Sequence, residues 1–375
     1  MAGLYFHIPF CASRCSYCGF FSTTNLEMQD RYVSALCREM DLREGYIKDA
    51  CDINTIYVGG GTPSQLSERN LKRLFGHIAD KGMLRANGKD MEITLECNLD
   101  DVNERFCQAL QALPVNRISM GVQTFSDKRL RFLHRRHTAT EVYRAIRLLR
   151  GIGIENISID LMFGFPDETI DEWRNDVEEA ISLNVEHISA YSLMYEEGTK
   201  LYRQLENGEI KKVNEETERL MYETLIEELS NAGYEHYEIS NFARHGYRSR
   251  HNSSYWQAIP YMGIGAAAHS YDVTSRQWNV ADITKYIKAI EQGNVPFEYE
   301  RLDANTLYND LITTALRTKE GISLQDIEPP YRDYLVSNAK KAIANGFLRI
   351  DNDRLHLTRD GLFISDDIMS DLIWI

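Results

Sequence analysis

Long hydrophobic runs are missing from this sequence. It contains no apolar stretch of about 18 residues, the length that a membrane-spanning helix needs. The first residues carry no basic segment followed by an apolar run, so we expect no signal peptide. Internal repeats at solenoid periods and low-complexity segments are absent too. These absences predict a globular protein of the cytoplasm with no transmembrane segment.

Basic residues are in the minority. The 42 Lys and Arg are outnumbered by 56 Asp and Glu, which leaves a formal net charge of −14. An acidic chain repels the phosphate backbone of nucleic acids, so we expect no nucleic-acid partner. The length of 375 residues allows two or three domains with ample buried core.

Cysteine is scarce, and its placement is uneven. The seven thiols are an odd number and four are isolated, which excludes a disulfide framework and favours a reducing compartment. The other three, Cys11, Cys15 and Cys18, follow the pattern C-x3-C-x2-C. Thiolates are the soft ligands that iron–sulfur clusters, zinc and copper(I) select. The next thiols, Cys37 and Cys51, lie in a predicted helix and a predicted loop.

A structural zinc site needs four protein ligands, and no fourth Cys or His follows the three thiols closely. Three thiolates without a fourth predict a 4Fe–4S cluster with one iron open to a small ligand. The alternative is three incidental reduced thiols in a turn.

The first half of the chain alternates β-rich runs with helical patterns. The expected strands are residues 4–8, 53–58, 91–96, 117–122, 157–162 and 187–193. The helical patterns between them include residues 30–44, 65–79, 126–133, 140–151 and 170–183. Such alternation predicts an α/β fold of parallel βαβ units with right-handed crossovers. Six units fall short of the eight that close a full barrel, so we expect a partial (β/α)6 barrel over residues 1–212.

In the next part, residues 213–303, the alternation fades. A long helix is expected at 215–232, an extended segment at 234–242 and a polar loop at 244–254. Residues 261–269 are rich in Gly and Ala, and such small residues let a backbone approach a ligand or another strand closely. We expect this part to complete the core.

Residues 304–375 look like a separate module. Helices are expected at 306–318 and 331–345, a short helix near 324–327, and a hairpin from 347–350 and 354–357. This order predicts a winged-helix-like α+β domain. A DNA-binding regulator would use such a module, but its acidic composition favours packing on the barrel as a lid. The amphipathic tail, 362–375, would pack internally or meet a partner.

Chemically distinctive residues follow the ends of the expected strands. After the three Cys come the glycine-rich turn 59–63, which follows the second strand, Glu96, which ends the third, Gln123, which follows the fourth, and Asp160, near the end of the fifth. Ligand sites on parallel sheets form at the carboxyl ends of the strands, so these groups predict one site. Each also has a plainer explanation. The turn is a tight βα connection, Glu96 pairs with a helix, and Asp160 forms a structural ion pair with Arg135.

Four sequence blocks make the prediction specific: residues 5–11, 59–64, 118–125 and 160–166. In this order they resemble the oxygen-independent coproporphyrinogen III oxidase-like family of radical S-adenosylmethionine (SAM) proteins, and the C-terminal module is similar too. The resemblance covers nearly the whole chain and implies a radical-SAM partial barrel. It implies that Cys11, Cys15 and Cys18 hold a 4Fe–4S cluster. It implies SAM contacts at Tyr5, Tyr17, Gly60, Gly61, Thr62, Glu96, Gln123, Arg135 and Asp160.

Two branches of that family differ at the cluster motif. The true oxidase resembles C-x3-C-x2-C-x-C with an N-terminal extension, whereas here Phe20 occupies the place of the fourth Cys and only ten residues precede Cys11. Residues 251–256 (H-N-S-S-Y-W) instead resemble a block of the HemW-type heme chaperones. This likeness implies heme and acceptor hemoproteins as partners, including respiratory cytochromes at the membrane surface, and assigns no catalytic residue. The alternative is an enzyme that decarboxylates coproporphyrinogen III propionates by a 5′-deoxyadenosyl radical.

Heme needs an apolar slot and usually an axial His, Cys, Met or Tyr. We expect the slot within residues 213–303, and His251 and His269 are the candidate ligands. Each has an alternative role: His251 as a cap of the polar loop, and His269 as a satisfied core residue. We expect a monomer or a homodimer.

Overall fold

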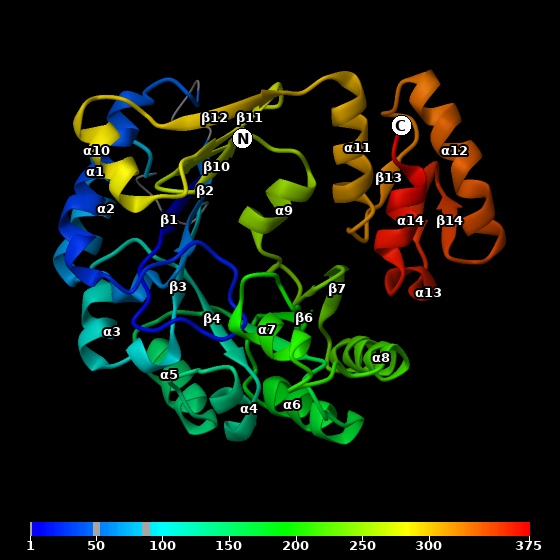
Figure 1. The fold of residues 1–375 in the computed structure, drawn as a ribbon, viewed down its shortest axis with the longest axis horizontal. Helices are drawn as coiled ribbons and strands as arrows, with labels where there is room; N and C mark the ends of the chain where they lie inside the picture. Colours follow the sequence, from blue (N-terminus) through cyan, green and yellow to red (C-terminus); the bar gives the residue numbers. More distant parts are fainter. Residues whose placement is uncertain (1, 48–52, 85–90) are drawn as a thin grey trace.

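A twelve-stranded sheet forms the centre of the computed structural model, which describes residues 2–47, 53–84 and 91–375 (Figure 1). Cys51 lies outside these residues. Six strands pair in parallel in chain order, which confirms the predicted βαβ alternation. These strands are β1 (Ala2–Ile8), β2 (Ile53–Gly60), β3 (Glu92–Cys97), β4 (Arg117–Gln123), β5 (Asn156–Phe163) and β6 (His187–Ser192).

Helices cover the outer face of these strands (Figure 1). They are α1 (Gln29–Leu42), α2 (Glu68–Asp80), α3 (Glu104–Gln111), α4 (Asp127–Phe132), α5 (Ala139–Gly151) and α6 (Ile170–Ser182). The local sequence explains their boundaries. In α2, Ser67 caps the amino end, and Leu71, Leu74 and Ile78 lie on one buried face. Capping boxes begin α5 and α6. Short 3₁₀ turns η1 (Leu26–Met28), η3 (Pro63–Gln65) and η4 (Leu99–Asp101) join the elements.

The glycine- and alanine-rich run supplies a seventh parallel strand. β9 (Tyr261–Ile264) pairs in parallel with β1 on the side opposite β2. A Cβ atom at Gly263 would lie 1.9 Å from the carbonyl oxygen of His269, so only glycine fits there. β10 (His269–Tyr271), β11 (Ser275–Asn279) and β12 (Phe297–Arg301) then extend this edge in antiparallel order.

The other edge of the sheet is also antiparallel. The extended segment expected at 234–242 is a hairpin of β7 (Glu235–Glu238) and β8 (Asn241–Ala243), and β8 pairs with β6. The helices α7 (Lys200–Glu206) and α8 (Glu215–Asn231) precede this hairpin. The sheet is therefore open, with parallel strands in the middle and antiparallel strands at both edges.

The polar loop expected at 244–254 is wrong in its second half, because α9 (Arg250–Trp256) begins there. The Ser249 side chain caps this helix by accepting from the backbone N–H of Asn252, 3.3 Å away. A seven-residue helix is too short to show a clear helical pattern of apolar residues, so its mostly polar sequence predicted a loop. Its buried member, His251, faces β1 and β2.

A buried carboxylate joins α1 to the β9 edge. Glu39 is fully buried and accepts hydrogen bonds from Arg43 (3.1 Å), the Tyr286 hydroxyl (2.6 Å), the Gly265 N–H (2.9 Å) and the Asn279 amide (2.8 Å). Tyr286 lies on α10 (Ile283–Glu291). Because every bond is charge-assisted and shielded from water, this network fixes the end of β9.

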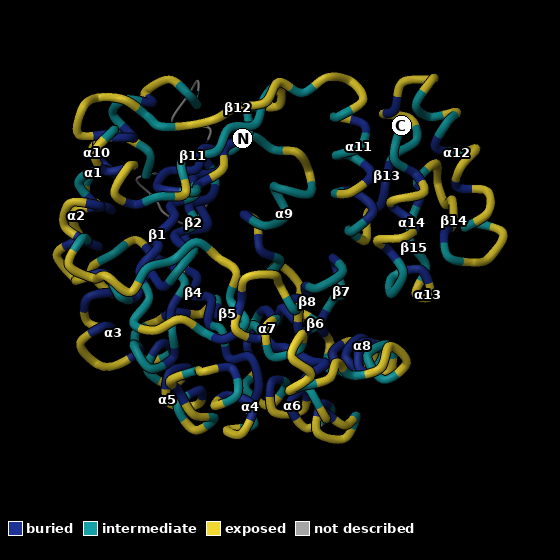
Figure 2. Tube along the Cα trace, in the orientation of Figure 1, coloured by how far each residue is buried: buried dark blue, intermediate teal, exposed yellow. Residues whose placement is uncertain are grey.

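The C-terminal module has its own hydrophobic core, separate from the core of the large sheet (Figure 2). It contains α11 (Ala304–Ala315), α12 (Pro329–Ala344), α13 (Arg359–Leu362), α14 (Ser365–Leu372) and a small sheet of β13 (Ile322–Ser323), β15 (Arg354–Leu357) and β14 (Leu348–Asp351). The short helix expected near 324–327 is wrong, because these residues form a turn after β13. The tail packs internally: the Trp374 ring lies 4.6 Å from that of Tyr334 and 4.8 Å from that of Tyr331.

The module is hydrogen-bonded to β7. The Lys319 N–H donates to the Tyr237 carbonyl (3.0 Å) and the Ile239 N–H to the Arg317 carbonyl (3.1 Å). The Arg317 guanidinium also pairs with buried Glu238 at 2.8 Å. The main core contains residues from both 1–212 and 213–303, and the division of the chain at 212/213 and 303/304 stays a prediction. None of the helices in the described residues is long and apolar enough to cross a membrane.

Candidate functional site

The cysteine loop follows β1 and is anchored at both ends. The Cys11 N–H donates to the Thr23 carbonyl (2.9 Å), and the Ser16 N–H donates to the Leu133 carbonyl (3.0 Å). His7 supports the loop from below: its Nε2 donates to the Phe21 carbonyl at 2.9 Å, and its Nδ1 accepts from the hydroxyl of Tyr5 at 3.0 Å. These bonds fix one tautomer of His7 and hold the loop against the sheet.

All three thiols of this loop are half-buried and face hydrogen-bond donors. The Thr62 hydroxyl lies 3.5 Å from the Cys11 sulfur, and Nη1 of Arg135 lies 3.6 Å from the Cys15 sulfur. Burial raises the pKa of Cys11 and of Cys18. Among the described residues, no three Cys, His, Asp or Glu side chains converge tightly enough to hold one metal ion. A cubane cluster requires no such convergence, since each thiolate binds a different iron, and the soft donor set fits it.

The glycine-rich turn after β2 packs directly on β1. Gly60 has a φ of 109°, and a Cβ atom there would lie 2.5 Å from the His7 ring. A Cβ atom at Gly61 would lie 2.8 Å from the Ile8 carbonyl oxygen, to which the Gly61 N–H donates at 2.8 Å. Both glycines are therefore required for a close βα turn, as the plainer explanation proposed. The same turn brings Thr62 to Cys11.

Two carboxyl groups lie inside the barrel beside this turn. Glu96 accepts from the Tyr57 hydroxyl at 2.6 Å and from the Gly60 N–H at 3.0 Å. Burial raises the pKa of Glu96 to about 7 and that of Asp160 to about 6. The structural ion pair considered for Asp160 is wrong, because among the described residues Asp160 makes no ion pair with Arg135. The nearby positive charges only moderate the effect of burial on its pKa.

Arg135 joins the cysteine loop to the ends of β3 and β4. Its Nη2 donates to the Gly121 carbonyl (2.6 Å) and to the side chain of Asn98 (3.3 Å).

Gln123 has a φ of 69° at the point where the β4–β5 register shifts, an unusual backbone conformation for a non-glycine residue. Burial raises the pKa of Tyr17 far above its usual value.

Seven of the nine predicted SAM-contact residues lie with the three Cys at the carboxyl end of the parallel strands, whereas Tyr5 and Asp160 lie in the middle of β1 and β5. That the nine residues bind SAM stays a prediction.

Sequence reasoning missed two residues, Asn98 just after β3 and Arg117 at the amino end of β4. Asn98 is hydrogen-bonded to both Arg135 and Thr62, each at 3.3 Å. Its position two residues after Glu96, just beyond a predicted strand end, could have marked it as a site residue. Arg117 is almost fully buried, and its Nε has no hydrogen-bond partner among the described residues. As the first residue of β4, it gave no signal in the sequence.

The two candidate heme ligands have different surroundings. His251 is buried, with Nδ1 bonded to the Thr55 hydroxyl (2.8 Å) and Nε2 to the Tyr255 hydroxyl (2.9 Å), and burial lowers its pKa to about 3. His269 is exposed at the start of β10, where its ring stacks on Trp278 with a centroid distance of 6.0 Å. The core role considered for His269 is therefore wrong, and His251 lies within α9 instead of capping a loop.

A buried carboxyl group in the turn after β5 gives a pH-dependence prediction. Glu168 accepts from the N–H groups of Gly164 (2.7 Å) and Phe165 (3.0 Å), and burial raises its pKa from 4.5 to about 7. Its folded-state pKa exceeds its unfolded one, so its contribution to stability is complete below about pH 4.5 and is lost as pH rises through about 7. We expect Glu168→Gln to lose less thermal stability than the parent protein between about pH 5 and pH 8.

Thermal midpoints across this pH range measure the effect. Glu172→Gln is the control. Arg129 contacts both carboxylates, Glu168 at 3.5 Å and Glu172 at 2.7 Å, but the pKa of Glu172 is lowered, which places its titration below the window. Equal pH slopes for Glu168→Gln and the parent protein would contradict the prediction.

Comparison with known proteins identifies the family. Residues 5–180 match the radical SAM superfamily and residues 302–364 match the HemN C-terminal domain. The heme chaperone HemW of Bacillus subtilis is 34% identical to this chain, over 98% of each protein. The chain belongs to the HemW family. Two further HemW proteins are 32% identical (Mycobacterium tuberculosis, 99% of this chain and 94% of that one) and 33% identical (Escherichia coli, 96% of each).

Among solved structures, Escherichia coli coproporphyrinogen III oxidase (HemN) has a TM-score of 0.83 over 99% of this chain and 90% of that one. Its 21% identity shows the fold alone. The predicted partial barrel with a small C-terminal module is confirmed, as is the predicted membership of the HemW branch. Membership of the radical SAM superfamily implies a 4Fe–4S cluster and SAM as cofactors.

Proposed function

We propose that this protein is a heme chaperone, which binds heme and passes it to acceptor hemoproteins. The observation that carries the proposal is the full-length identity of about one third with heme chaperones named HemW. The block at 251–256 supports it, because it forms the short helix α9 at the edge of a large cavity. The reduced thiols favour the cytoplasm.

Cys11, Cys15 and Cys18 would hold the cluster, and the nine residues around them would bind SAM. When bound, the cluster supplies an open iron for SAM and a one-electron donor. The chain's own residues position it: Thr62 and Arg135 face the Cys11 and Cys15 sulfurs. The carboxylate of Glu96 would accept hydrogen bonds from a ribose or an ammonium group.

Phe20 supports the chaperone over the oxidase. Phe20 occupies the position of the fourth oxidase Cys, so this chain has no thiol at that position. The Phe20 side chain is 69% exposed.

Of the two candidate heme ligands, His269 has the more favourable geometry. Its ring is exposed, and neither ring nitrogen makes a hydrogen bond among the described residues. Coordination by His251 would break its bond to Thr55 or to Tyr255. We expect His269→Ala to weaken hemin binding and alter the absorption spectrum of the complex. His251→Ala would chiefly destabilise the barrel interior, because it leaves the half-buried Tyr255 hydroxyl without a partner.

A paired assay on one anaerobically reconstituted preparation tests the function. We expect the protein to bind hemin and transfer it to an apo-cytochrome, without turning coproporphyrinogen III into protoporphyrinogen IX. Efficient decarboxylation without heme transfer would instead identify an oxidase.

A further inference from the structure

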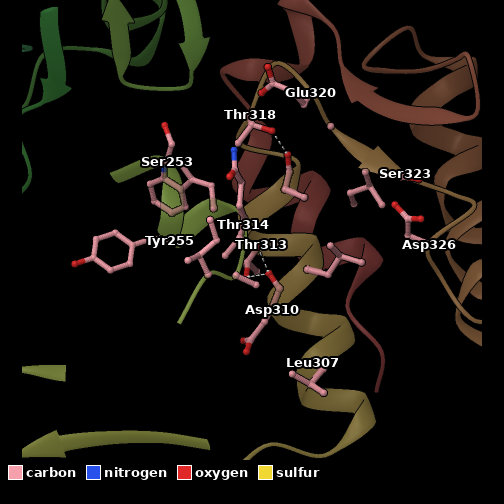
Figure 3. Close-up of a pocket in the computed structure, with 18 of the residues that line it drawn as sticks. Ser253, Tyr255, Leu307, Asp310, Thr313, Thr314, Thr318, Glu320, Ser323 and Asp326 are labelled. Carbon is pink, nitrogen blue, oxygen red and sulfur yellow. Dashed lines mark hydrogen bonds between the residues drawn. The ribbon is translucent and has the colours of Figure 1, made fainter. Parts of the chain in front are cut away.

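A large cavity lies between α9 and the C-terminal module, with a volume of about 940 Å³. Figure 3 shows Ser253 and Tyr255 on one side and the α11 residues Leu307, Asp310 and Thr314 on the other. This junction cavity also includes the inward face of β10 and β11. Its volume falls within the roughly 300–1,000 Å³ of small-molecule and cofactor pockets.

The junction cavity is separate from the cysteine loop. Tyr261, which lines it, pairs with Gly3 at the amino end of β1, whereas the cysteine loop follows the carboxyl end of β1. The two sites therefore lie at opposite ends of the parallel strands.

Aromatic rings form one wall of the junction cavity. The rings of Tyr255 and Tyr261 meet edge to face at a centroid distance of 4.7 Å, and Tyr261 lies 6.4 Å from Tyr271. Trp256, the last residue of α9, also lines the cavity. Such rings give a rigid apolar surface of ring faces and edges, against which an aromatic ligand can stack or pack edge to face.

Two buried donors at this wall have no acceptor. The Nε of Arg276 and the Nε1 of Trp256 lack a hydrogen-bond partner among the described residues. Most buried donors in proteins are paired, so each of these points to a missing acceptor. The Nη2 of Arg276 contacts Asp310 at 3.1 Å, and its Nε lies 3.9 Å from Glu300.

Charge alone does not select the ligand of the junction cavity, because its basic and acidic side chains balance. The charged residues that line it are Arg248, Arg276, Arg354, Asp310, Glu320 and Asp326. The aromatic wall and the two unpaired donors together therefore specify the ligand: a flat ring system that carries hydrogen-bond acceptors.

We propose that the junction cavity binds the heme macrocycle against the tyrosine wall, with a propionate carboxylate accepting from Arg276 in place of Asp310. This inference rests on the proposed chaperone function. The sheet register supports it, since Tyr271 pairs with Arg276 and His269 pairs with Trp278 one step along the same face. A heme held by Arg276 would thus lie on the face that carries the imidazole of His269.

The test compares hemin with its dimethyl ester, in which both propionates are neutral, on the full-length protein. We expect the ester to bind the parent protein about 10- to 100-fold more weakly, the range of a hydrogen bond to a charged group. Arg276→Gln should weaken hemin binding by a similar factor and abolish the difference between hemin and ester. The control is Arg301→Gln, because Arg301 lies exposed on β12 and pairs with Ser275, on the opposite face of the sheet. It should bind hemin as the parent protein does.

Two results would overturn the inference while leaving the chaperone function intact: unchanged hemin affinity in Arg276→Gln, or an undiminished preference of that variant for hemin over ester. Misfolding alone would weaken the binding of hemin and of the ester equally and leave the preference for hemin unchanged. It therefore cannot be mistaken for loss of the Arg276 contact. A parent protein that binds no hemin would instead overturn the proposed function itself.

Discussion

Serine in place of Cys11, Cys15 or Cys18 is expected to abolish the iron–sulfur cluster. A serine hydroxyl is a harder and much less acidic donor than a thiol, so each substitution removes one of only three protein ligands. We expect reconstituted variants to lose the cluster's visible absorption and its magnetic-resonance signal, and to retain little bound iron and sulfide. SAM binding should fall with them, because the open iron is lost.

Cys107→Ser is the matched control for these substitutions. Cys107 is a buried thiol on α3, and its side chain contributes to the main core instead of the cysteine loop. This variant should bind iron and sulfide as the parent protein does. Full cluster content in any one of the three loop variants would show that its thiol is not a ligand.

Glu39→Ala is expected to lower the free energy of unfolding by about 3–5 kcal/mol, the cost of breaking a buried ion pair by removing one partner. The substitution leaves the Arg43 guanidinium buried without its carboxylate and deprives Tyr286, Asn279 and the Gly265 N–H of their acceptor. Urea denaturation of the variant and the parent protein measures the difference.

Glu291→Ala provides the comparison, because Glu291 also joins α10 to α1, through a 2.9 Å pair with Arg31. That pair is half-exposed, so we expect its loss to cost below about 1 kcal/mol. A Glu39→Ala variant as stable as Glu291→Ala would show that the buried network contributes nothing to stability.

The sequence allowed the parallel core to be predicted because buried parallel strands read as continuous apolar runs between amphipathic helices. β9 escaped this pattern. It has four residues, one of them the Gly263 that the nearby His269 carbonyl requires, so its strand character depends on a neighbour that is distant in sequence. The edges β10–β12 escaped for a similar reason, since β12 is exposed along its whole length.

The candidate site was predictable where the residue type and its position relative to the strands were enough to indicate its role. The three Cys and the glycine-rich turn follow strand ends, Glu96 lies near the end of β3, and Asp160 lies within β5. The surroundings of the histidines were not predictable in this way. Whether an imidazole is free depends on Thr55 and Tyr255 for His251 and on Trp278 for His269, and only the folded chain shows these partners.

The C-terminal module links the two borders of the unclosed sheet. The module begins directly after β12, one edge strand of the sheet. Its residues Lys319 and Arg317 are bonded to β7, the other edge strand. The module therefore acts as a tie across the side of the barrel that lacks strands. A movement of the module would therefore change the spacing between the two edge strands, β12 and β7.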